Sequence, residues 1–372
     1  MDCASIIPDV NYGSFSRRLQ SAIVQARIPA GGSIDLTSRC NLNCIHCYVK
    51  SNPREPELTL PELDRLLDEI AVAGCLWLLM TGGEPLLRPD FAEVYLLAKK
   101  KGFLINLFTN AVLVTERTAG LLAEWRPFAI EVTLYGATKE TYEQVTRTPG
   151  SFERCMNGIK LIRENGLPLR FKTMLLNVNR DELNRMMALA ESLGCEFRYD
   201  SNIHGHLDGT KDPCEYRLTP EEIVALDRED PRRISALREY IDYSSQFHRA
   251  ENRVFHCGAG LNSFHIDSLG RLSPCMLARR DSYDLRHGNF PAGWDLLRRI
   301  REREAGADTK CACCHLYELC GQCPGWGEIE NGDAEAPSEF LCQLAHVREA
   351  AYGAELFAEA PGNNIDKRLG RR

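Results

Sequence analysis

Long apolar stretches are absent from this 372-residue chain. Because a membrane-spanning helix needs at least about 18 consecutive apolar residues, we expect no membrane anchor. The segment from Met1 to Ser5 has no basic residues leading into an apolar run, so we expect no secretory signal either. The net charge of −7 gives no general attraction to nucleic acid or to an anionic membrane. These absences predict a cytoplasmic globular protein with neither nucleic acid nor a membrane as its partner.

Cysteine, in contrast, is abundant, with 16 residues in the chain. In a reducing cytoplasm this number does not indicate a disulfide framework, because disulfides rarely persist there. We therefore expect most of these thiols to bind metal. A few isolated ones, among them Cys75, Cys155 and Cys195, are predicted to be small core or surface residues.

Strand-type runs alternate regularly with helical patterns between residues 33 and 203. Alternation of this kind indicates parallel βαβ units with right-handed crossovers. The run Leu76–Met80 is continuously apolar and predicts a strand buried on both faces. The predicted strands cover residues 33–37, 76–80, 104–108, 128–134, 169–176 and 196–199, and the predicted helices cover residues 59–74, 90–101, 115–125, 151–165 and 181–193.

This count of elements predicts an α/β fold, a partial (β/α)6 TIM-type barrel followed by a small C-terminal cysteine-rich domain. Functional groups are expected on the loops after the strand C-termini, as in full barrels. The N-terminal lead-in has room for one short helix and is too short for an additional peptide-binding domain. The expected segments are the lead-in at 1–32, the barrel at 33–203, a linker with a helical connection at 204–256, the small domain at 257–345 and a tail at 346–372.

Three cysteines follow the first predicted strand in the pattern Cys40-x3-Cys44-x2-Cys47. Thiols at this spacing on one loop can turn toward a common centre. Four thiolates complete an iron–sulfur cube, whereas three leave one iron open to a non-protein ligand. A zinc site is the alternative, and it would need a fourth ligand such as His46, which lies between two of the cysteines.

The second predicted strand is followed by Thr81-Gly82-Gly83-Glu84-Pro85. Gly82 and Gly83 can adopt positive φ and let the backbone approach a ligand closely. Glu84, or a neighbouring carbonyl, can accept a hydrogen bond from an ammonium group. Taken alone the segment is equally consistent with a plain turn, but its place one βα unit after the cysteine loop favours a ligand site.

Polar residues also stand at the ends of the next two predicted strands. Thr109 and Asn110 end the third, and Thr133 lies near the end of the fourth. Polar groups at the carboxyl ends of apolar barrel strands indicate a ligand rather than packing. Arg147 and Arg154 are two alternative sources of a guanidinium group for a carboxylate.

The spacing of Cys40, Cys44 and Cys47, with Gly82 to Pro85 one unit later, resembles the signature of the radical S-adenosylmethionine (SAM) enzymes. In that family the three cysteines hold a 4Fe–4S cluster whose open iron chelates the amino and carboxylate groups of SAM. The resemblance implies that Gly82, Gly83, Glu84 and Pro85 bind the SAM amino group. It also implies contacts from Thr109, Asn110 and Thr133 to the ribose and carboxylate, from Arg147 or Arg154 to the carboxylate, and from Tyr48 to the adenine.

A second set of cysteines occupies the C-terminal part of the chain as Cys257-x12-Gly270-x4-Cys275, Cys311-x2-Cys314-x5-Cys320-x2-Cys323 and Cys342. This pattern resembles the SPASM extension of radical SAM enzymes, which binds two auxiliary iron–sulfur clusters. The gap before Cys323 is one residue shorter than is usual in the family, and Cys313 is an extra thiol. A zinc ribbon of Cys311, Cys314, Cys320 and Cys323 is the alternative. The implied ligand groups are Cys257, Cys275 and Cys323 for one cluster, and Cys311, Cys314, Cys320 and Cys342 for the other.

The resemblance implies an enzyme in which an electron delivered to the SAM-bound cluster releases a 5′-deoxyadenosyl radical that abstracts a substrate hydrogen. Many relatives with a SPASM extension modify ribosomally made peptides, so the first hypothesis is a maturase that crosslinks or oxidises a precursor peptide. The auxiliary clusters would accept an electron or bind substrate. The implied partners are the peptide or a small-molecule substrate, an electron donor such as a flavodoxin or ferredoxin, and a separate leader-binding protein.

Two other functions are compatible with the same residues. A radical SAM dehydrogenase or epimerase of a small molecule, such as an aminosugar, cyclitol or tetrapyrrole, would use the same cofactors. A non-catalytic iron–sulfur or zinc protein that senses redox state would be expected to lose the SAM contacts, yet residues 82–85, 109 and 110 keep the pattern.

Overall fold

The computed structural model describes residues 12–49, 56–247, 253–306, 309–311 and 314–357. Within them, nine strands form one sheet in the order β6-β5-β4-β3-β2-β1-β7-β8-β9. Strands β1 to β7 pair in parallel, and β8 and β9 continue the sheet antiparallel. The strands are β1 Gly31–Asp35, β2 Trp77–Thr81, β3 Leu104–Thr109, β4 Ala129–Thr133, β5 Leu169–Met174, β6 Glu196–Asp200, β7 Ser263–Ile266, β8 Arg271–Ser273 and β9 Tyr283–Asp284.

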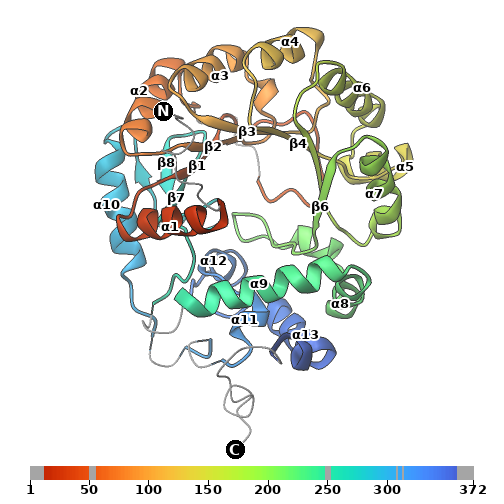
Figure 1. Ribbon diagram of the computed structural model, residues 1–372, viewed down its shortest axis with the longest axis vertical. Helices are drawn as coiled ribbons and strands as arrows, with labels where there is room; N and C mark the ends of the chain where they lie inside the picture. Colours follow the sequence, from red (N-terminus) through yellow and green to blue (C-terminus); the bar gives the residue numbers. More distant parts are fainter. Residues whose placement is uncertain (1–11, 50–55, 248–252, 307–308, 312–313, 358–372) are drawn as a thin grey trace, which may run out of the picture.

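Helices cover the outer, convex face of this curved sheet (Figure 1). Several begin at a threonine whose hydroxyl accepts a hydrogen bond from the free backbone N–H three residues on, as Thr59, Thr115 and Thr138 do. Thr59 and Glu62 form the predicted capping box. The covering elements are α2 Leu60–Val72, η2 Pro85–Leu87, α3 Phe91–Lys100, α4 Glu116–Glu124, α5 Lys139–Thr146, α6 Ser151–Glu164, η3 Arg180–Glu182 and α7 Leu183–Ser192.

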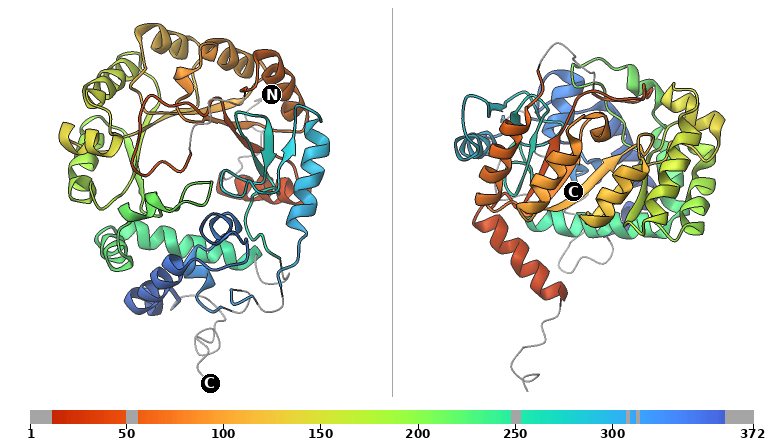
Figure 2. Two further views of the ribbon diagram at one scale, coloured as in Figure 1. Left: turned by 180° about the vertical axis from the view of Figure 1, so that it is seen from behind. Right: turned by 90° about the horizontal axis from the view of Figure 1, so that it is seen from above.

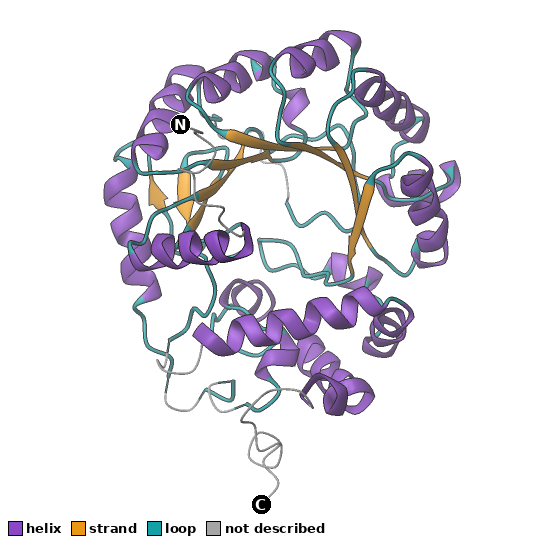
Figure 3. Ribbon diagram, in the orientation of Figure 1, coloured by secondary structure: helices purple, strands orange, loops and turns teal. Residues whose placement is uncertain are grey.

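The core lies between the sheet and these helices. On β3, Ile105 and Leu107 are fully buried against the helices, while Asn106 and Phe108 on the opposite face are only partly buried. The prediction that residues 76–80 are buried on both faces is therefore wrong. The side chain of Trp77 is 38% exposed and Leu79 is partly buried, because the inner face of the sheet lines the barrel interior and carries no helical layer (Figure 3).

The predicted α/β fold with an open partial barrel is confirmed, and six predicted strands are present as β1 to β6. Helix α5 and strands β7 to β9 were not among the predicted elements. Strand β7 pairs with β1 from Gly31 opposite Ser263 to Ile34 opposite Ile266. The sheet therefore continues past residue 257, where the small C-terminal domain was expected to begin.

The remaining helices lie across the open side of the curved sheet, except that α10 flanks β8 and α1 extends away from the body of the molecule (Figures 1 and 2). Helix α13 packs against α8 and α11. No helix among the described residues is both long and apolar enough to cross a membrane. These elements are α1 Tyr12–Gln25, η4 Asp212–Tyr216, α8 Pro220–Glu229, α9 Pro231–Phe247, α10 Phe290–Arg301, α11 Tyr317–Cys320, α12 Pro324–Asn331 and α13 Glu339–Phe357.

Candidate functional site

The loop that carries Cys40, Cys44 and Cys47 leaves the carboxyl end of β1 and is held at several points. The buried Thr37 hydroxyl donates a 2.6 Å hydrogen bond to Glu57, which also accepts the backbone N–H of Ser38 at 2.9 Å. Farther along, the backbone N–H groups of Asn43 and Ile45 donate to carbonyls of the last turn of α5, each at 3.0 Å. The loop is thus anchored to the sheet at one end and to α5 at the other.

The three thiols lie close enough to influence one another. Burial raises the pKa of Cys40 to about 11, and the nearby Glu84 and Cys47 add to this rise. Burial and both neighbouring thiols also raise the pKa of Cys44. Three thiols on one loop suit a 4Fe–4S cluster with one open iron, because each cysteine binds a different iron. No three metal-binding side chains among the described residues converge on a single-ion position.

His46, the alternative fourth ligand for zinc, is buried between the cysteines and packs against Tyr135 with ring centroids 5.2 Å apart. Burial lowers its pKa to about 4. Its Nδ1 atom is buried without a hydrogen-bond partner among the described residues. The ring therefore serves as part of the packing beneath the loop.

Gly82 and Gly83 pack directly on the backbone of the cysteine loop. Gly82 has a φ of +129°, and a Cβ atom there would lie 2.3 Å from the carbonyl oxygen of Thr37. A Cβ atom on Gly83 would lie 2.1 Å from the carbonyl oxygen of Arg39. The backbone N–H of Gly83 donates to Thr37 at 2.8 Å. The predicted positive φ is confirmed at Gly82, and the close backbone approach is made to the protein's own loop.

Glu84 is completely buried, and its carboxylate is surrounded by donors. The Thr109 hydroxyl donates at 2.7 Å, and the backbone N–H groups of Asn110 and Leu86 donate at 2.8 and 3.2 Å. Burial raises its pKa to about 7, and these hydrogen bonds oppose the rise. The Glu84 carboxylate oxygens already accept hydrogen bonds that hold β3 to β2. A backbone carbonyl of residues 82–85 is therefore a more accessible acceptor for an ammonium group than the Glu84 side chain.

Asn110 connects β3 to the cysteine loop. Its Nδ2 atom lies 2.9 Å from Oδ1 of Asn41 and 3.9 Å from Sγ of Cys40. Its Oδ1 accepts the backbone N–H of Val112 at 3.0 Å. Thr133 lies on the inner face of β4, opposite Lys172 of β5. The structure thus brings Gly82 to Glu84, Thr109 and Asn110 together beside Cys40.

The two arginines predicted to pair with a carboxylate are both exposed. Arg147 follows α5 with a φ of +47° and donates to the Tyr216 hydroxyl at 3.2 Å. Arg154 donates to the carbonyl of Gly150 at 3.0 Å on its own helix, α6. Arg147 directly follows Thr146, whose carbonyl binds the cysteine loop. Arg147 is therefore the better placed of the two for the role implied by the resemblance.

Tyr48 links the barrel to the C-terminal segment. Its hydroxyl lies 4.0 Å from Sδ of Met276, the residue after Cys275, and its ring meets His204 edge-on at 5.2 Å. The backbone N–H of Leu207 donates to its carbonyl at 3.0 Å. Burial raises the pKa of its phenol. These contacts give Tyr48 a structural role, and its contact with an adenine stays a prediction.

A buried charged network lies below this contact and was not predicted. Asp35, at the end of β1, is 3.3 Å from Nε2 of His265 on β7 and 3.2 Å from Nη2 of Arg279. Nδ1 of the same histidine lies 2.9 Å from the Ser33 hydroxyl. Although burial alone would raise the pKa of Asp35, His265 and Arg279 hold it below its ordinary value. The signal in the sequence is a carboxylate, Asp35, at the end of a short strand that otherwise has no charged residue.

The C-terminal cysteines form two groups in space. Burial raises the pKa of Cys323 to about 12, and the nearby thiols of Cys275 and Cys257 contribute. Burial likewise raises the pKa of Cys320 to about 12, and here the contributing thiols are Cys342, Cys311 and Cys314. Backbone N–H groups of Ala278 and Trp326 donate to the sulfurs of Cys275 and Cys323 at 3.3 and 3.4 Å.

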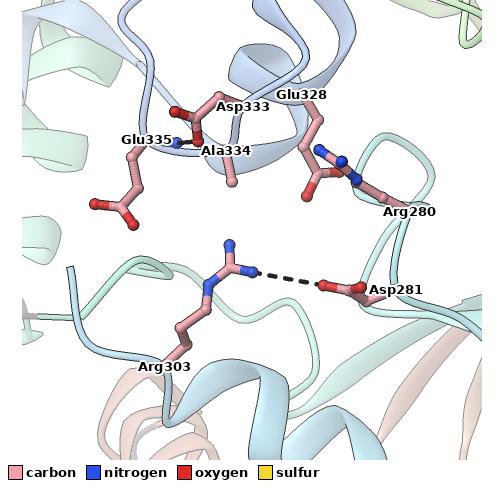
Figure 4. Close-up of a pocket in the computed structure, with 7 residues that line it drawn as sticks. All are labelled: Arg280, Asp281, Arg303, Glu328, Asp333, Ala334 and Glu335. Carbon is pink, nitrogen blue, oxygen red and sulfur yellow. Dashed lines mark hydrogen bonds and ion pairs between the residues drawn. The ribbon is translucent and has the colours of Figure 1, made fainter. Parts of the chain in front are cut away.

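A cavity of about 250 Å³ opens near the C-terminal segment, apart from all of the predicted site residues (Figure 4). Arg303 and Asp281 face each other across it at 3.5 Å. Asp333 accepts the backbone N–H of Glu335 at 3.0 Å. Its lining carries two arginines and four carboxylates, so acidic side chains outnumber basic ones within it. Its lining residues are Arg280, Asp281, Arg303, Glu328, Asp333, Ala334 and Glu335.

Part of the chain matches a known protein family. The sequence profile of the Radical SAM superfamily matches residues 34–190, which include the cysteine loop and the segment from Gly82 to Pro85. The chain is 27% identical to an AdoMet-dependent heme synthase of Methanosarcina barkeri, over 80% of this chain and 92% of the relative. It is 28% identical to a PqqA peptide cyclase of Granulibacter bethesdensis, over 88% of this chain and 91% of the relative.

The fold is also found among solved structures. The crystal structure of Streptococcus suis SuiB bound to the precursor peptide SuiA superposes with a TM-score of 0.67. The match covers 91% of this chain and 84% of SuiB, with 16% sequence identity. At that identity the likeness establishes the arrangement of the elements.

Proposed function

We propose that the chain is a radical SAM enzyme that binds a 4Fe–4S cluster and SAM, and that it modifies a ribosomally synthesised peptide. The observation that carries the proposal is the three-thiol loop, seated on Gly82 and Gly83 and flanked by Asn110. With the cluster and SAM bound, delivery of one electron would supply the chemistry that removes a hydrogen atom from the substrate, and an auxiliary cluster would accept the electron left on the substrate. The residues of the chain would have to hold the reacting C–H of the peptide beside SAM and exclude water.

Our assignment of the site follows the positions of the side chains. Cys40, Cys44 and Cys47 would hold the cluster, and carbonyls of residues 82–85 would accept the SAM ammonium group. Arg147 would pair with the SAM carboxylate. Glu84 and Thr109 act as positioning residues, because their hydrogen bonds hold β3 to β2 beside the cysteine loop.

We assign two auxiliary iron–sulfur clusters to the C-terminal thiols. The proximity of Cys257, Cys275 and Cys323, and separately of Cys311, Cys314, Cys320 and Cys342, supports this division. The first set would leave one iron without a cysteine. Tyr48 and Arg279 connect the loops of the SAM cluster and of Cys275 to the same buried network, so the two centres would have a fixed relative position.

The peptide-cyclase relative favours a peptide substrate, and its alignment covers nearly the whole chain. We propose a precursor peptide as substrate, a flavodoxin or ferredoxin as electron donor, a separate leader-binding protein as further partner and the cytoplasm as the location. The expected segments 33–203 and 257–345 would carry the SAM cluster and the auxiliary clusters respectively.

A second function is favoured by one specific observation. The heme-synthase relative is 27% identical over 80% of this chain, so modification of a small molecule such as a tetrapyrrole is the alternative. The two functions differ in substrate and share the cofactor chemistry. They are therefore separated only by an experiment that offers both substrates.

The first test uses anaerobically reconstituted protein, wild type beside a variant with Cys40, Cys44 and Cys47 changed to alanine. About twelve irons falling to about eight, with loss of 5′-deoxyadenosine release under dithionite, is the expected result. Release of deoxyadenosine by the variant, or binding of zinc in place of iron, would contradict the assignment. Short peptides encoded near this gene and a tetrapyrrole are then offered in parallel, and a mass change in a peptide supports the proposed function.

A further inference from the structure

The inner face of strands β4, β5 and β6 is strongly charged. The outer face of the same strands carries core residues such as Ile130, Val132 and Phe171, so the alternate side chains must point into the barrel. This inner wall faces the centre of the curved sheet (Figure 1). Its charged members are Glu131, Arg170, Lys172, Glu196, Arg198 and Asp200.

Ion pairs account for four of these six charges. Arg170 binds Glu196 at 2.9 Å, and Arg198 binds Glu131. Asp200, at the end of β6, accepts the backbone N–H of Asn202 at 2.8 Å. Within the described part of the chain, no carboxylate lies within 4.0 Å of the Lys172 ammonium group. Lys172 is therefore the cation that the wall leaves without an ionic partner.

The surroundings of Lys172 increase the energetic cost of its charge. The ammonium group lies over the face of the Phe108 ring, and the Arg198 guanidinium is 5.9 Å from the same ring. A cation–π contact replaces only part of the lost hydration. Burial lowers the pKa of Lys172 well below its ordinary value; the charge of Glu131 opposes this decrease and the charge of Arg198 adds to it. An anion bound here in addition to Glu131 would be stabilised by both Lys172 and Arg198.

The position of Lys172 relates it to the reaction. It is the register partner of Thr133 on β4 and of Arg198 on β6, close to the carboxyl ends of the strands. Ligands of barrel enzymes bind at this end. The cysteine loop leaves the same end of β1, so a group bound by Lys172 would lie inside the barrel on the wall across from β1.

We propose that Lys172, with Arg198 beside it, binds a carboxylate of the substrate. This inference rests on the proposed function, and it narrows the substrate to a peptide that presents a carboxylate near the modified residue. The carboxylate comes either from an aspartate or glutamate side chain or from the peptide's C-terminus. Binding protonates Lys172, so affinity decreases as pH rises above the pKa of the empty site.

The test measures protection of Lys172 from chemical modification in the reconstituted enzyme with SAM present. Reductive methylation with formaldehyde and borane, followed by peptide mass spectrometry, reports on this amine without requiring turnover. N-acetyl-glutamate α-amide supplies a side-chain carboxylate, N-acetyl-alanine supplies a terminal one, and N-acetyl-glutamine amide is the uncharged control. Lys160, exposed on the outer helix α6, is the internal reference for labelling.

Protection by either carboxylate probe, at about a tenth or less of the concentration that the amide requires, supports the proposal and names the carboxylate source. Equal protection by the amide overturns it. Full protection by SAM alone also overturns it, because Lys172 would then belong to the cofactor site. Failure of the proposed function would show separately, as unmodified peptides in the mass assay.

Two variants that change the charge around Lys172 provide a second test, because they should change protection by the carboxylate probes in opposite directions. Glu131→Gln leaves two unpaired cations and should strengthen protection by the carboxylate probes about tenfold. Arg198→Met removes the partner of Glu131, so Glu131 can neutralise Lys172 instead. Protection by the carboxylate probes should then weaken by a similar factor. Lys160→Met should change nothing. Equal effects of Glu131→Gln and Arg198→Met would contradict the electrostatic basis of the site. Lys172→Met has no amine to label, so thermal shifts with the same probes extend the test to this variant.

Discussion

Glu84 and Lys172 are both ionisable residues inside the protein, yet they have opposite roles. The carboxylate of Glu84 is surrounded by three donors and joins neighbouring strands, whereas Lys172 has an aromatic face and no ionic partner among the described residues. A saturated buried group holds structure together, and an unsatisfied one is available to a ligand.

For Glu84, the informative change is Glu84→Gln. The glutamine side chain has an NH₂ group where glutamate has a second acceptor oxygen, and this group would face a donor, either the Thr109 hydroxyl or the Asn110 backbone N–H. Because two donors then face each other, we expect a loss of about 2 kcal/mol in the free energy of unfolding. Because the strand ends beside Cys40 would shift, iron content after reconstitution should also fall. Denaturant unfolding and iron analysis measure both effects, with exposed Glu124→Gln as the control. Unchanged stability would mean that the buried carboxylate does not hold the strands.

For Lys172, stability should depend on pH in a defined direction. Its folded-state pKa is lowered, while the unfolded chain stays protonated up to about pH 10. Between these values the unfolded state binds more protons, so wild-type stability rises with pH. Lys172→Met should remove this rise and stabilise the protein at neutral pH by on the order of 1 kcal/mol. Thermal unfolding measured from pH 6 to 10 checks this prediction, with Lys160→Met as the control. Parallel curves of stability against pH for wild type and Lys172→Met would refute it.

At the scale of elements, the turn after β2 is shaped by the loop after β1. Gly83→Ala would place a Cβ atom 2.1 Å from the Arg39 carbonyl, and backbone atoms cannot yield as side chains do. We expect a loss of about 1–3 kcal/mol in stability and incomplete assembly of the SAM-bound cluster. Chemical unfolding and SAM cleavage measure the two effects.

Gly120→Ala is the matched control for that change. Gly120 lies in α4, where an added Cβ meets nothing within 4 Å, so stability should stay level or rise by up to about 1 kcal/mol. If both variants lost the same stability, close packing of the two loops would not be the cause.

For the whole molecule, charged side chains add to the strand pairing that connects β1 to the C-terminal part of the chain. Asp35 contacts His265 and Arg279, residues more than 200 positions away in sequence. Removing one partner of a buried ion pair costs about 3–5 kcal/mol, so Asp35→Asn should unfold at clearly lower temperature.

The same contact predicts a pH dependence. Because the folded pKa of Asp35 is depressed, its stabilisation is fully present above its unfolded value of about 3.9 and is lost as pH falls through the folded value. Acid titration of stability should therefore be shallower in Asp35→Asn than in wild type. Exposed Asp181→Asn is the control, and identical acid profiles in wild type and Asp35→Asn would disprove the role of this carboxylate.

Several features could be predicted because they depend on neighbours in sequence. The capping box at Thr59 and Glu62, the six parallel strands and the positive φ of Gly82 follow from local patterns of polarity and from residues with special backbone preferences. Helix α5 was missed because it has only eight residues, of which only Tyr142 and Val145 are apolar. Strand β7 was missed because only its pairing with β1 identifies it.

The sequence by itself determined the three-thiol loop, its place after a strand and the order of the βα units, because spacing along the chain sets which residues share a loop or a face. Only the tertiary structure decided which charges share the barrel interior and which remain unpaired. Glu131, Lys172 and Arg198 lie on three different strands, and their registers alone bring them to one wall. Long-range pairing sets those registers, and with them the local dielectric environment that makes Lys172 available to a ligand.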